Sequence, residues 1–201
     1  GNAGSSAAGN DAGGSGGTSA GGTDAGGGGT SAGSGGNAAG GAGAGGSSSQ
    51  ARPNKMFVTS ASVDLATFAG RGEGDALCQK LAASAGLPNV DQYRAWLSDK
   101  VVDARQVLGA ARGWVRTDGE PFADTSGNLA SGKIFYPPRL DEKGQDIGET
   151  AKVVTGTKDD GTKAGNEICE GWTGAGNVRI GDPNRTTEAW TSSSSDACTG
   201  K

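Results

Sequence analysis

The residues best suited to ligand chemistry lie late in the chain, between Gly156 and Thr187. Binding residues concentrate in loops held on a rigid scaffold, and this stretch is rich in Gly, Asp, Asn and Thr. Charges of both signs among polar neighbours favour a wet interface with a protein or a glycan over catalysis. The candidate ligand-binding residues are Asp159, Asp160, Lys163, Glu170, Arg179 and Arg185.

Two other chemistries could use the same loops. Oxygen-bearing side chains are frequent there, which makes a weak calcium site an alternative to an ordinary solvated loop. No EF-hand spacing is present, so the solvated loop is the default and no cofactor is expected. A carboxylate hydrolase using, for instance, Asp159 or Glu170 is a further alternative, but it needs environments that split the two pKa values. The oxygen ligands would be Asp159, Asp160, Asn166, Glu167, Glu170, Asp182 and Asn184.

The chain contains no histidine, which excludes Ser-His-Asp and Cys-His catalysis and most zinc sites. Gly156–Lys163 has the glycine spacing of a phosphate-binding loop. However, the two residues after Gly161 are Thr and then Lys, the reverse of the motif, and no amphipathic helix follows. The sequence therefore predicts neither a nucleotide site nor an enzyme.

Composition divides the chain near residue 50. Residues 1–50 hold 21 of the 40 glycines and no aliphatic residue larger than alanine, which predicts a disordered Gly/Ala/Ser stalk. Residues 51–201 carry the aromatic residues and the cysteines and are long enough for one domain. The net charge is −4, which gives no electrostatic footprint for nucleic acid. No apolar run is long enough for a transmembrane segment.

The elements that must position the loops begin with one helix and one strand. Apolar residues recur at helical spacing from Asp75 to Ala85, Gly86 can close the helix, and Pro88 cannot continue it. Residues 93–97 predict a strand, with Trp96 packed on the Leu77/Leu81 face of the helix. Cys78 would lie in the same core.

Further along the chain, short strands alternate with loops. Asp103 with Gln106 predicts a capping box for a helix at residues 104–108, and Phe122 is expected in irregular chain. Trp172 and Trp190 are expected in the core rather than on a sugar-stacking surface, because this region has few other large apolar residues. The predicted fold class is α+β with few helices, short strands and long loops. The strands are expected at residues 55–63, 113–116, 134–136 and 152–155.

Four motifs together resemble a known family. The chain is similar to a family of bacterial extracellular and lipoprotein domains of unknown function, which resembles the endostatin domain of type XVIII collagen and the C-type lectin-like fold. The resemblance covers residues 56–198. It is carried by Asp75–Cys78, Gly86–Leu87, Tyr93–Ser98 and Val154–Thr157.

The resemblance implies a pairing for the three cysteines. Endostatin-like domains join the second cysteine to the third, which implies a Cys169–Cys198 disulfide and leaves Cys78 unpaired. It also implies a further strand with a fourth cysteine beyond Lys201, so that this chain would be truncated at its C-terminus. The histidine-rich zinc ligands and the heparin-binding arginines of endostatin have no counterpart here, and Asp182-Pro183-Asn184 only echoes a lectin calcium motif.

These observations give one expected function and two rivals. The expected function is a non-enzymatic binding module for adhesion to an extracellular protein or glycan. It would be secreted or displayed on a bacterial surface, with a lipid anchor upstream of the chain as one means of attachment. The rivals are a structural spacer without a specific ligand and the carboxylate hydrolase.

Overall fold

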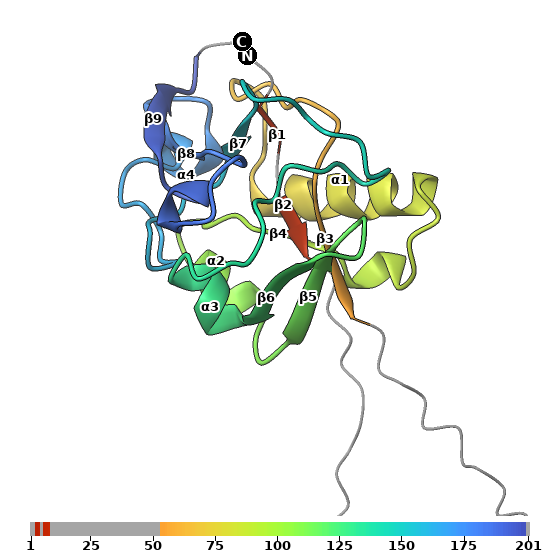
Figure 1. The fold of residues 1–201 in the computed structure, drawn as a ribbon. Coiled ribbons are helices and arrows are strands. Elements are labelled where there is room, and N and C mark those ends of the chain that lie inside the picture. Colours follow the sequence, from red (N-terminus) through yellow and green to blue (C-terminus); the bar gives the residue numbers. More distant parts are fainter. Residues whose placement is uncertain (1–2, 5, 9–52, 200–201) are drawn as a thin grey trace, which may run out of the picture. The chain divides into compact units, whose positions relative to one another are not determined.

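Two small β-sheets form the framework of an α+β domain in residues 3–4, 6–8 and 53–199, which are the residues that the computed structural model describes (Figure 1). One sheet has the strand order β1-β7-β8-β9 and the other β4-β2-β3-β5-β6. The strands are β1 Ala3–Gly4, β2 Ser6–Ala8, β3 Asn54–Val58, β4 Arg94–Ala95, β5 Arg112–Arg116, β6 Pro121–Thr125, β7 Lys152–Val154, β8 Asn177–Gly181 and β9 Ser194–Ala197. The helices are α1 Arg71–Ser84, α2 Ala104–Val107, α3 Ser126–Ala130 and α4 Cys169–Trp172, with 3-10 turns at η1 Val90–Gln92 and η2 Glu188–Trp190.

The predicted end of the first long helix is confirmed, whereas its start lies earlier than predicted. Gly86 adopts φ +68°, and the N–H groups of Gly86 and Leu87 donate to the carbonyls of Ala83 and Ala82. This double hydrogen bond is the Schellman pattern that a glycine at this position permits. Because α1 begins at Arg71, Asp75 lies beyond the first turn. Its carboxylate accepts a hydrogen bond from the Ala95 N–H at 2.7 Å and so ties α1 to β4.

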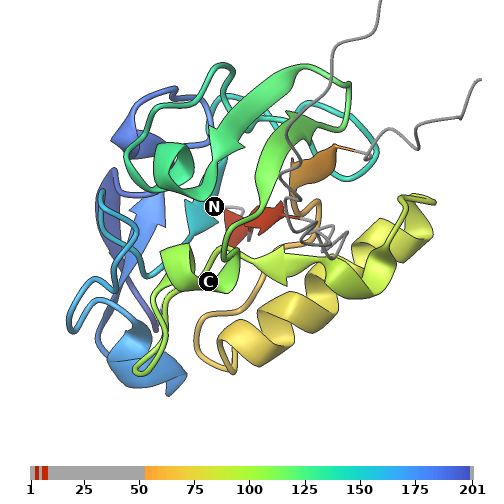
Figure 2. The ribbon, with the colours of Figure 1, turned by 90° about the horizontal axis from the view of Figure 1, so that it is seen from below.

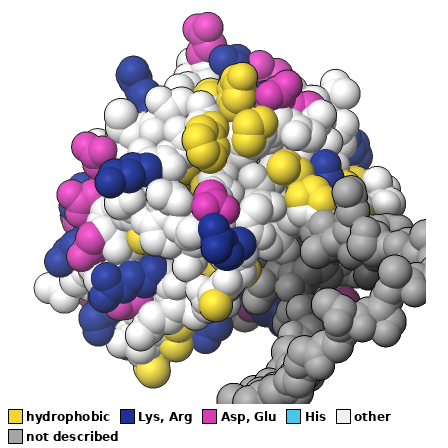
Figure 3. Space-filling model, turned by 60° about the horizontal axis from the view of Figure 1, so that its bottom comes forward, with side chains coloured by type: hydrophobic (Ala, Val, Ile, Leu, Met, Phe, Trp, Pro, Cys, Tyr) yellow, Lys and Arg dark blue, Asp and Glu magenta, His cyan; other side chains and the backbone are white. Residues whose placement is uncertain are grey.

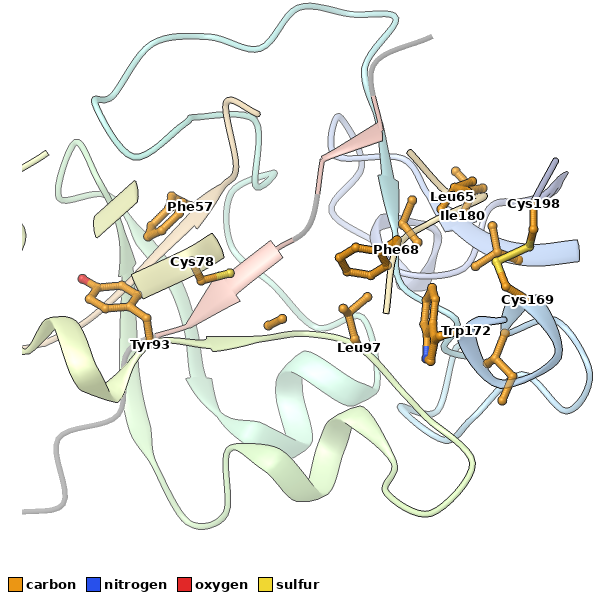
Figure 4. Packing of buried hydrophobic residues seen from close by; sticks show 14 of the residues in the cluster. Phe57, Leu65, Phe68, Cys78, Tyr93, Leu97, Cys169, Trp172, Ile180 and Cys198 are labelled. Carbon is orange, nitrogen blue, oxygen red and sulfur yellow. A yellow bond between two sulfur atoms is a disulfide. The ribbon is translucent and has the colours of Figure 1, made fainter. Parts of the chain in front are cut away.

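The buried face of α1 is made of small residues. Gly74, Cys78 and Ala82 recur every four residues and are buried, and α1 lies against β4 and β2 (Figure 2). A Cβ on Gly74 would lie 2.9 Å from the Ala95 Cβ, so only glycine lets the helix approach the strand this closely. Cys78 is fully buried and is an unpaired thiol, and burial raises its pKa (Figure 4).

Trp96 does not pack on α1 as predicted. Side chains of a strand alternate between its two faces, so Tyr93, Ala95 and Leu97 face α1 while Trp96 points the other way. Two core clusters result. The first lies between α1, β3 and α4 and contains, among others, Phe57, Phe68, Cys78, Tyr93, Leu97, Trp172, Ile180 and the disulfide cysteines (Figure 4). The second contains Met56, Trp96, Leu108, Trp114, Phe122, Leu129, Ile134 and Trp190, among others.

Both tryptophans expected in the core are buried. Trp172 is 8% exposed and meets Phe68 edge to face, with ring centroids 5.5 Å apart. Trp190 is 1% exposed and packs on Trp96 and Phe122 at 5.4 and 5.6 Å. Aromatic pairs at these separations add about 0.5–1.5 kcal/mol beyond the burial of their area.

Buried hydroxyl groups connect the two clusters. The Trp96 indole N–H donates to the Thr191 hydroxyl at 2.8 Å, and the Thr155 hydroxyl donates to the Thr191 carbonyl at 2.7 Å. The hydroxyls of Ser98 and Thr157 lie 2.9 Å apart and share a hydrogen bond. Buried polar groups must be paired in this way, because an unpaired one costs about 1–3 kcal/mol.

Several strand predictions were wrong. Residues 134–136 form no strand, and Phe122 lies within β6 rather than in irregular chain. β6 escapes a propensity search because it starts at Pro121, which a strand accepts at its first residue on a sheet edge. The expected strand at residues 55–63 ends at Val58, and that at 93–97 is only Arg94–Ala95. The capping box of Asp103 and Gln106 is confirmed by the 2.9 Å hydrogen bond from Asp103 N–H to the Gln106 side chain.

Part of the N-terminal stretch belongs to the sheets. Residues 1–50 were expected to be a disordered stalk, but Ala3–Gly4 and Ser6–Ala8 form β1 and β2. Backbone pairing can recruit residues of low strand propensity where neighbouring strands are already buried. The remainder of that expectation, residues 9–50, lies outside the described residues.

Within the described ranges, no helix combines the length and the apolar composition that crossing a bilayer requires.

We expect Thr191→Val to lower the free energy of unfolding by about 1–3 kcal/mol, because the buried Trp96 indole N–H loses its acceptor while the side-chain volume stays nearly constant. Chemical denaturation measures the loss. A double-mutant cycle with Trp96→Phe is the control, since removing both partners should cost less than the sum of the single changes. Strict additivity of the two changes would contradict the pairing.

Candidate functional site

A disulfide fixes the loop region that the sequence singled out. Cys169, at the start of α4, is bonded to Cys198, which follows β9, and their Cα atoms lie 5.6 Å apart. This is the pairing that the family resemblance implies. The bridge closes the segment that contains α4, β8 and η2, and closing such a loop stabilises the folded state by about 3–4 kcal/mol in the chain-entropy model.

The backbone of α4 is strained. Cys169, Glu170, Gly171 and Trp172 have φ angles of 51°, 52°, 82° and 67°, so four consecutive residues are left-handed. A left-handed conformation costs a residue other than glycine roughly 1–2 kcal/mol. Such strain persists only where the surroundings over-determine it, and it clusters at ligand sites and other functional positions.

Several contacts hold the α4 backbone in place besides the disulfide. The Ile168 carbonyl accepts hydrogen bonds from the N–H groups of Gly171 and Trp172, both at 2.8 Å. The Trp172 indole N–H donates to the Ser98 carbonyl at 3.1 Å. A Cβ on Gly70 would lie 2.5 Å from the Trp172 ring, so glycine there makes room for the indole.

The strained turn forms one wall of a surface cavity of about 720 Å³, which we call the α4 cavity. Charges of both signs line it, together with the exposed backbone around three glycines. The Lys163 ammonium donates to the Lys100 carbonyl at 3.0 Å and so joins two loops that are distant in sequence. The residues that matter for its chemistry are Lys100, Lys163, Asn166, Glu167 and Glu170.

Two charges in the α4 cavity have no partner within the protein. Among the described residues, neither the Lys100 ammonium nor the Glu170 carboxylate forms a hydrogen bond or an ion pair. The aliphatic part of Lys100 lies over Gly171, where an added Cβ would meet its Cε at 1.9 Å. The cavity therefore presents one positive and one negative group to a ligand, and the α4 backbone that forms its wall is held in one conformation.

Asp99 positions the loop that carries Lys100. Its carboxylate accepts hydrogen bonds from the N–H groups of Val101 and Val102 at 2.8 and 2.7 Å and pairs with the Arg71 guanidinium at 3.0 Å. Partial burial opposes ionisation of Asp99, but these hydrogen bonds and the Arg71 charge outweigh it and lower its pKa. The loop therefore depends on a charged carboxylate.

A second cavity, of about 590 Å³, lies where the loop 158–163 meets α2 and α3, and we call it the Asp159 cavity. Asp160 accepts hydrogen bonds from the Thr162 hydroxyl and N–H at 2.5 and 2.9 Å, which lower its pKa. Gly161 has φ +79°, and an added Cβ would lie 2.8 Å from Ala130 and 2.9 Å from Arg105. The cavity is lined by Arg105, Ser126, Asp159, Asp160 and Glu188, among others.

The structure separates the six predicted binding residues into three groups. Lys163 and Glu170 line the α4 cavity, whereas Asp159 and Asp160 line the Asp159 cavity. Arg179 is ion-paired with Glu167, and Arg185 pairs with Asp182 at 2.9 Å outside both cavities. For Asp182, burial opposes ionisation, but hydrogen bonds from Asn184 and Arg185 outweigh it and lower the pKa. The two arginines therefore serve turns of the chain rather than an open site.

Sequence reasoning missed three cavity residues, namely Lys100, Arg105 and Glu188. No local spacing could have found Lys100 and Arg105, because they lie far in sequence from residues 156–187. Glu188 lies just beyond that stretch, in η2. The face shown in Figure 3 has basic and acidic side chains interspersed rather than grouped by sign.

The oxygen-rich residues do not converge on one point. Among residues 3–4, 6–8 and 53–199, no group of three or more Asp, Glu, His or Cys side chains is arranged to hold a metal ion. Asp159 and Glu170, the carboxylates considered for a hydrolase, line different cavities. Comparison with known proteins adds no assignment, since no protein-family model matches the chain and no curated protein matches its sequence.

We expect Gly161→Ala to cost about 2–4 kcal/mol, because it combines left-handed strain with overpacking against Ala130 and Arg105. Gly165→Ala is the matched control in the same loop region, since φ is +60° there but nothing lies within 4 Å of the added Cβ. It should cost only about 1 kcal/mol. Urea denaturation measures both, and equal losses would show that the loop does not dock on α2 and α3.

Stability should also depend on the Asp99 charge. The folded-state pKa of Asp99 is lowered, so its charge stabilises the folded state above the unfolded pKa of about 3.9 and stops doing so as the pH falls through the folded value. Asp99→Asn should therefore melt below the wild type at pH 7, and the difference should shrink towards zero below pH 4. Asp124→Asn, in an exposed ion pair with Arg112, is the control and should show a smaller effect at pH 7.

Proposed function

We propose that the chain is a non-enzymatic binding module that takes an extracellular protein or glycan in the α4 cavity. The observation that carries the proposal is the left-handed turn Cys169–Trp172 in the wall of the cavity. The disulfide and the buried Trp172 side chain keep this turn in its strained conformation. A turn held in this way presents the cavity in one conformation, which lowers the ordering cost of binding.

The extracellular part of the proposal draws on redox chemistry and on resemblance. Disulfides persist in secreted and surface proteins, and the Cys169–Cys198 bridge is compatible with that setting. The endostatin-like and C-type lectin-like resemblance favours the same setting and a binding role. A bacterial surface location, with a lipid anchor upstream, belongs to the proposal as well.

The α4 cavity is a better ligand site than the other candidates because it offers available charges of both signs. Among the described residues, the unpartnered charges of the Asp159 cavity, Asp159 and Glu188, are both acidic, and its Arg105 pairs with Asp103 at 3.8 Å. Lys100 and Glu170 have no partners among the described residues, whereas Asp160, Arg179 and Arg185 are each committed to neighbouring groups. A ligand with both a donor-rich and an acidic group, such as a polar peptide segment or an acidic glycan, could satisfy both charges. A spacer domain without a ligand offers no reason for a strained turn, which is why we place that function second.

The test uses the full chain on arrays of glycans and matrix proteins, followed by affinity measurement for any partner found. Lys100→Met with Glu170→Gln removes both charges and keeps the side-chain volumes, so binding should weaken at least about tenfold while stability changes by less than about 0.5 kcal/mol. Arg112→Met with Asp124→Asn, an exposed pair on β5 and β6, is the matched control and should bind like the wild type.

Two outcomes would contradict the proposal. Binding that survives the double change in the α4 cavity but fails with Asp159→Asn would place the site in the Asp159 cavity instead. Failure of the intact chain to bind any partner would favour the spacer function.

A further inference from the structure

The strand β2 occupies an interior position of its sheet although its connection to that sheet is long. β2 runs antiparallel to both neighbours, with Ala7 opposite Phe57 of β3 and opposite Ala95 of β4 (Figure 1). Residues 9–53 separate β2 from β3, whereas adjacent antiparallel strands need only two to five connecting residues. Sequence proximity therefore does not explain why this segment fills this position.

The neighbouring strands β3 and β4 explain why β2 lies there, because their backbone groups need a strand to pair with. Met56, Phe57 and Val58 of β3 are at most 2% exposed, and Ala95 of β4 is fully buried. Without a strand between them, their facing N–H and C=O groups would be unpaired in an apolar environment, which is costly. Helix α1 packs across β2 and forms the floor of the channel between β3 and β4, which we call the strand channel.

The strand channel does not select strongly for the amino-acid sequence of the strand that fills it. The segment Ser6-Ala7-Ala8 has only small residues, which are not favoured in strands. Its pairing is therefore a backbone interaction, as in the recognition of extended peptides at sheet edges. Any copy of the same segment offers an identical row of backbone donors and acceptors.

We propose that the strand channel, with the adjoining edge of β7, is an acceptor site that takes the β1 and β2 segments of a second copy of this chain as well as its own. In a reciprocal exchange each copy gives one segment and receives one, so every pairing of β1 with β7 and of β2 with β3 and β4 is kept. The product is a two-fold symmetric dimer with equivalent contacts. A short hairpin would force β2 to pair with the β3 of its own chain, whereas a connection as long as residues 9–53 does not.

Protein concentration decides whether the chain is a monomer that pairs with its own segment or a dimer that exchanges segments. A segment on its own chain competes at an effective concentration on the order of 1 mM for connections of this kind, so dilute protein stays monomeric. Crowding on a surface or concentration above that value favours exchange. Cys78 reports the state of the channel, because its thiol is fully buried on the face of α1 towards β2 (Figure 4).

The test uses the full chain with Ala7→Pro, which removes the N–H at the centre of the segment and disfavours an interior strand position. A labelled peptide of residues 1–12 should bind this variant saturably and slow the labelling of Cys78. It should bind at least about tenfold more weakly to the control Ala38→Pro, whose own segment still competes. The same peptide with Ala7→Pro should not bind either variant.

A second measurement covers the case in which Ala7→Pro does not fold. Wild-type chain refolded at about 1 mM should yield dimers on size-exclusion chromatography with light scattering, and a mixture of isotopically light and heavy chains should yield mixed dimers. The proposal would be overturned by peptide binding that is equal in the two proline variants. It would also be overturned by the absence of dimers from the concentrated wild type, or by dimers that form as readily in a folded Ala7→Pro variant.

Discussion

Hydrogen bonds among four buried hydroxyl side chains hold the two core clusters in one arrangement. Ser98 follows β4, Thr155 and Thr157 follow β7, and Thr191 follows η2, so the network joins the ends of three elements that are far apart in sequence. In an apolar interior each of these bonds is directional and costly to lose, which makes the network a geometric constraint as well as a source of stability. The sheets can slide or twist only by breaking it.

The loops that line the two cavities are attached to the same network. Trp172 donates to the Ser98 carbonyl, and the Ala104 N–H at the start of α2 donates to the Ser98 hydroxyl at 3.0 Å, so both cavities are fixed relative to this one residue. This arrangement explains why the sequence pointed to loops that line the two cavities but not to the residues from other elements that complete them. Composition identified residues 156–187 as loops rich in polar groups. The unpartnered charges of Lys100 and Glu170 face one cavity only because the fold brings the loop after β4 next to α4.

The predictable parts of the fold are those encoded by neighbouring residues. Gly86 ends α1, and Asp103 with Gln106 starts α2, because both signals act within one turn of helix. Trp96 was misplaced because size alone does not tell which face of a strand a side chain occupies. β6 and β8 contain proline or glycine and form only because partner strands supply their hydrogen bonds. The strands β1 and β2 are the extreme case, since nothing in Ala, Gly and Ser predicts a strand.

The position of β1 has a consequence for how the chain is made. Ala3 is made well before Lys152, yet the two pair, and the sheet that contains both ends with β9 near the last residue described. At a synthesis rate of roughly 5–20 residues per second, Ala3 waits on the order of ten seconds for its partner. A strand made early is thus among the last that can be placed, so the domain cannot be completed piece by piece during translation. Its final step couples β1 to strands made much later, and in a secreted protein that step would fall after export.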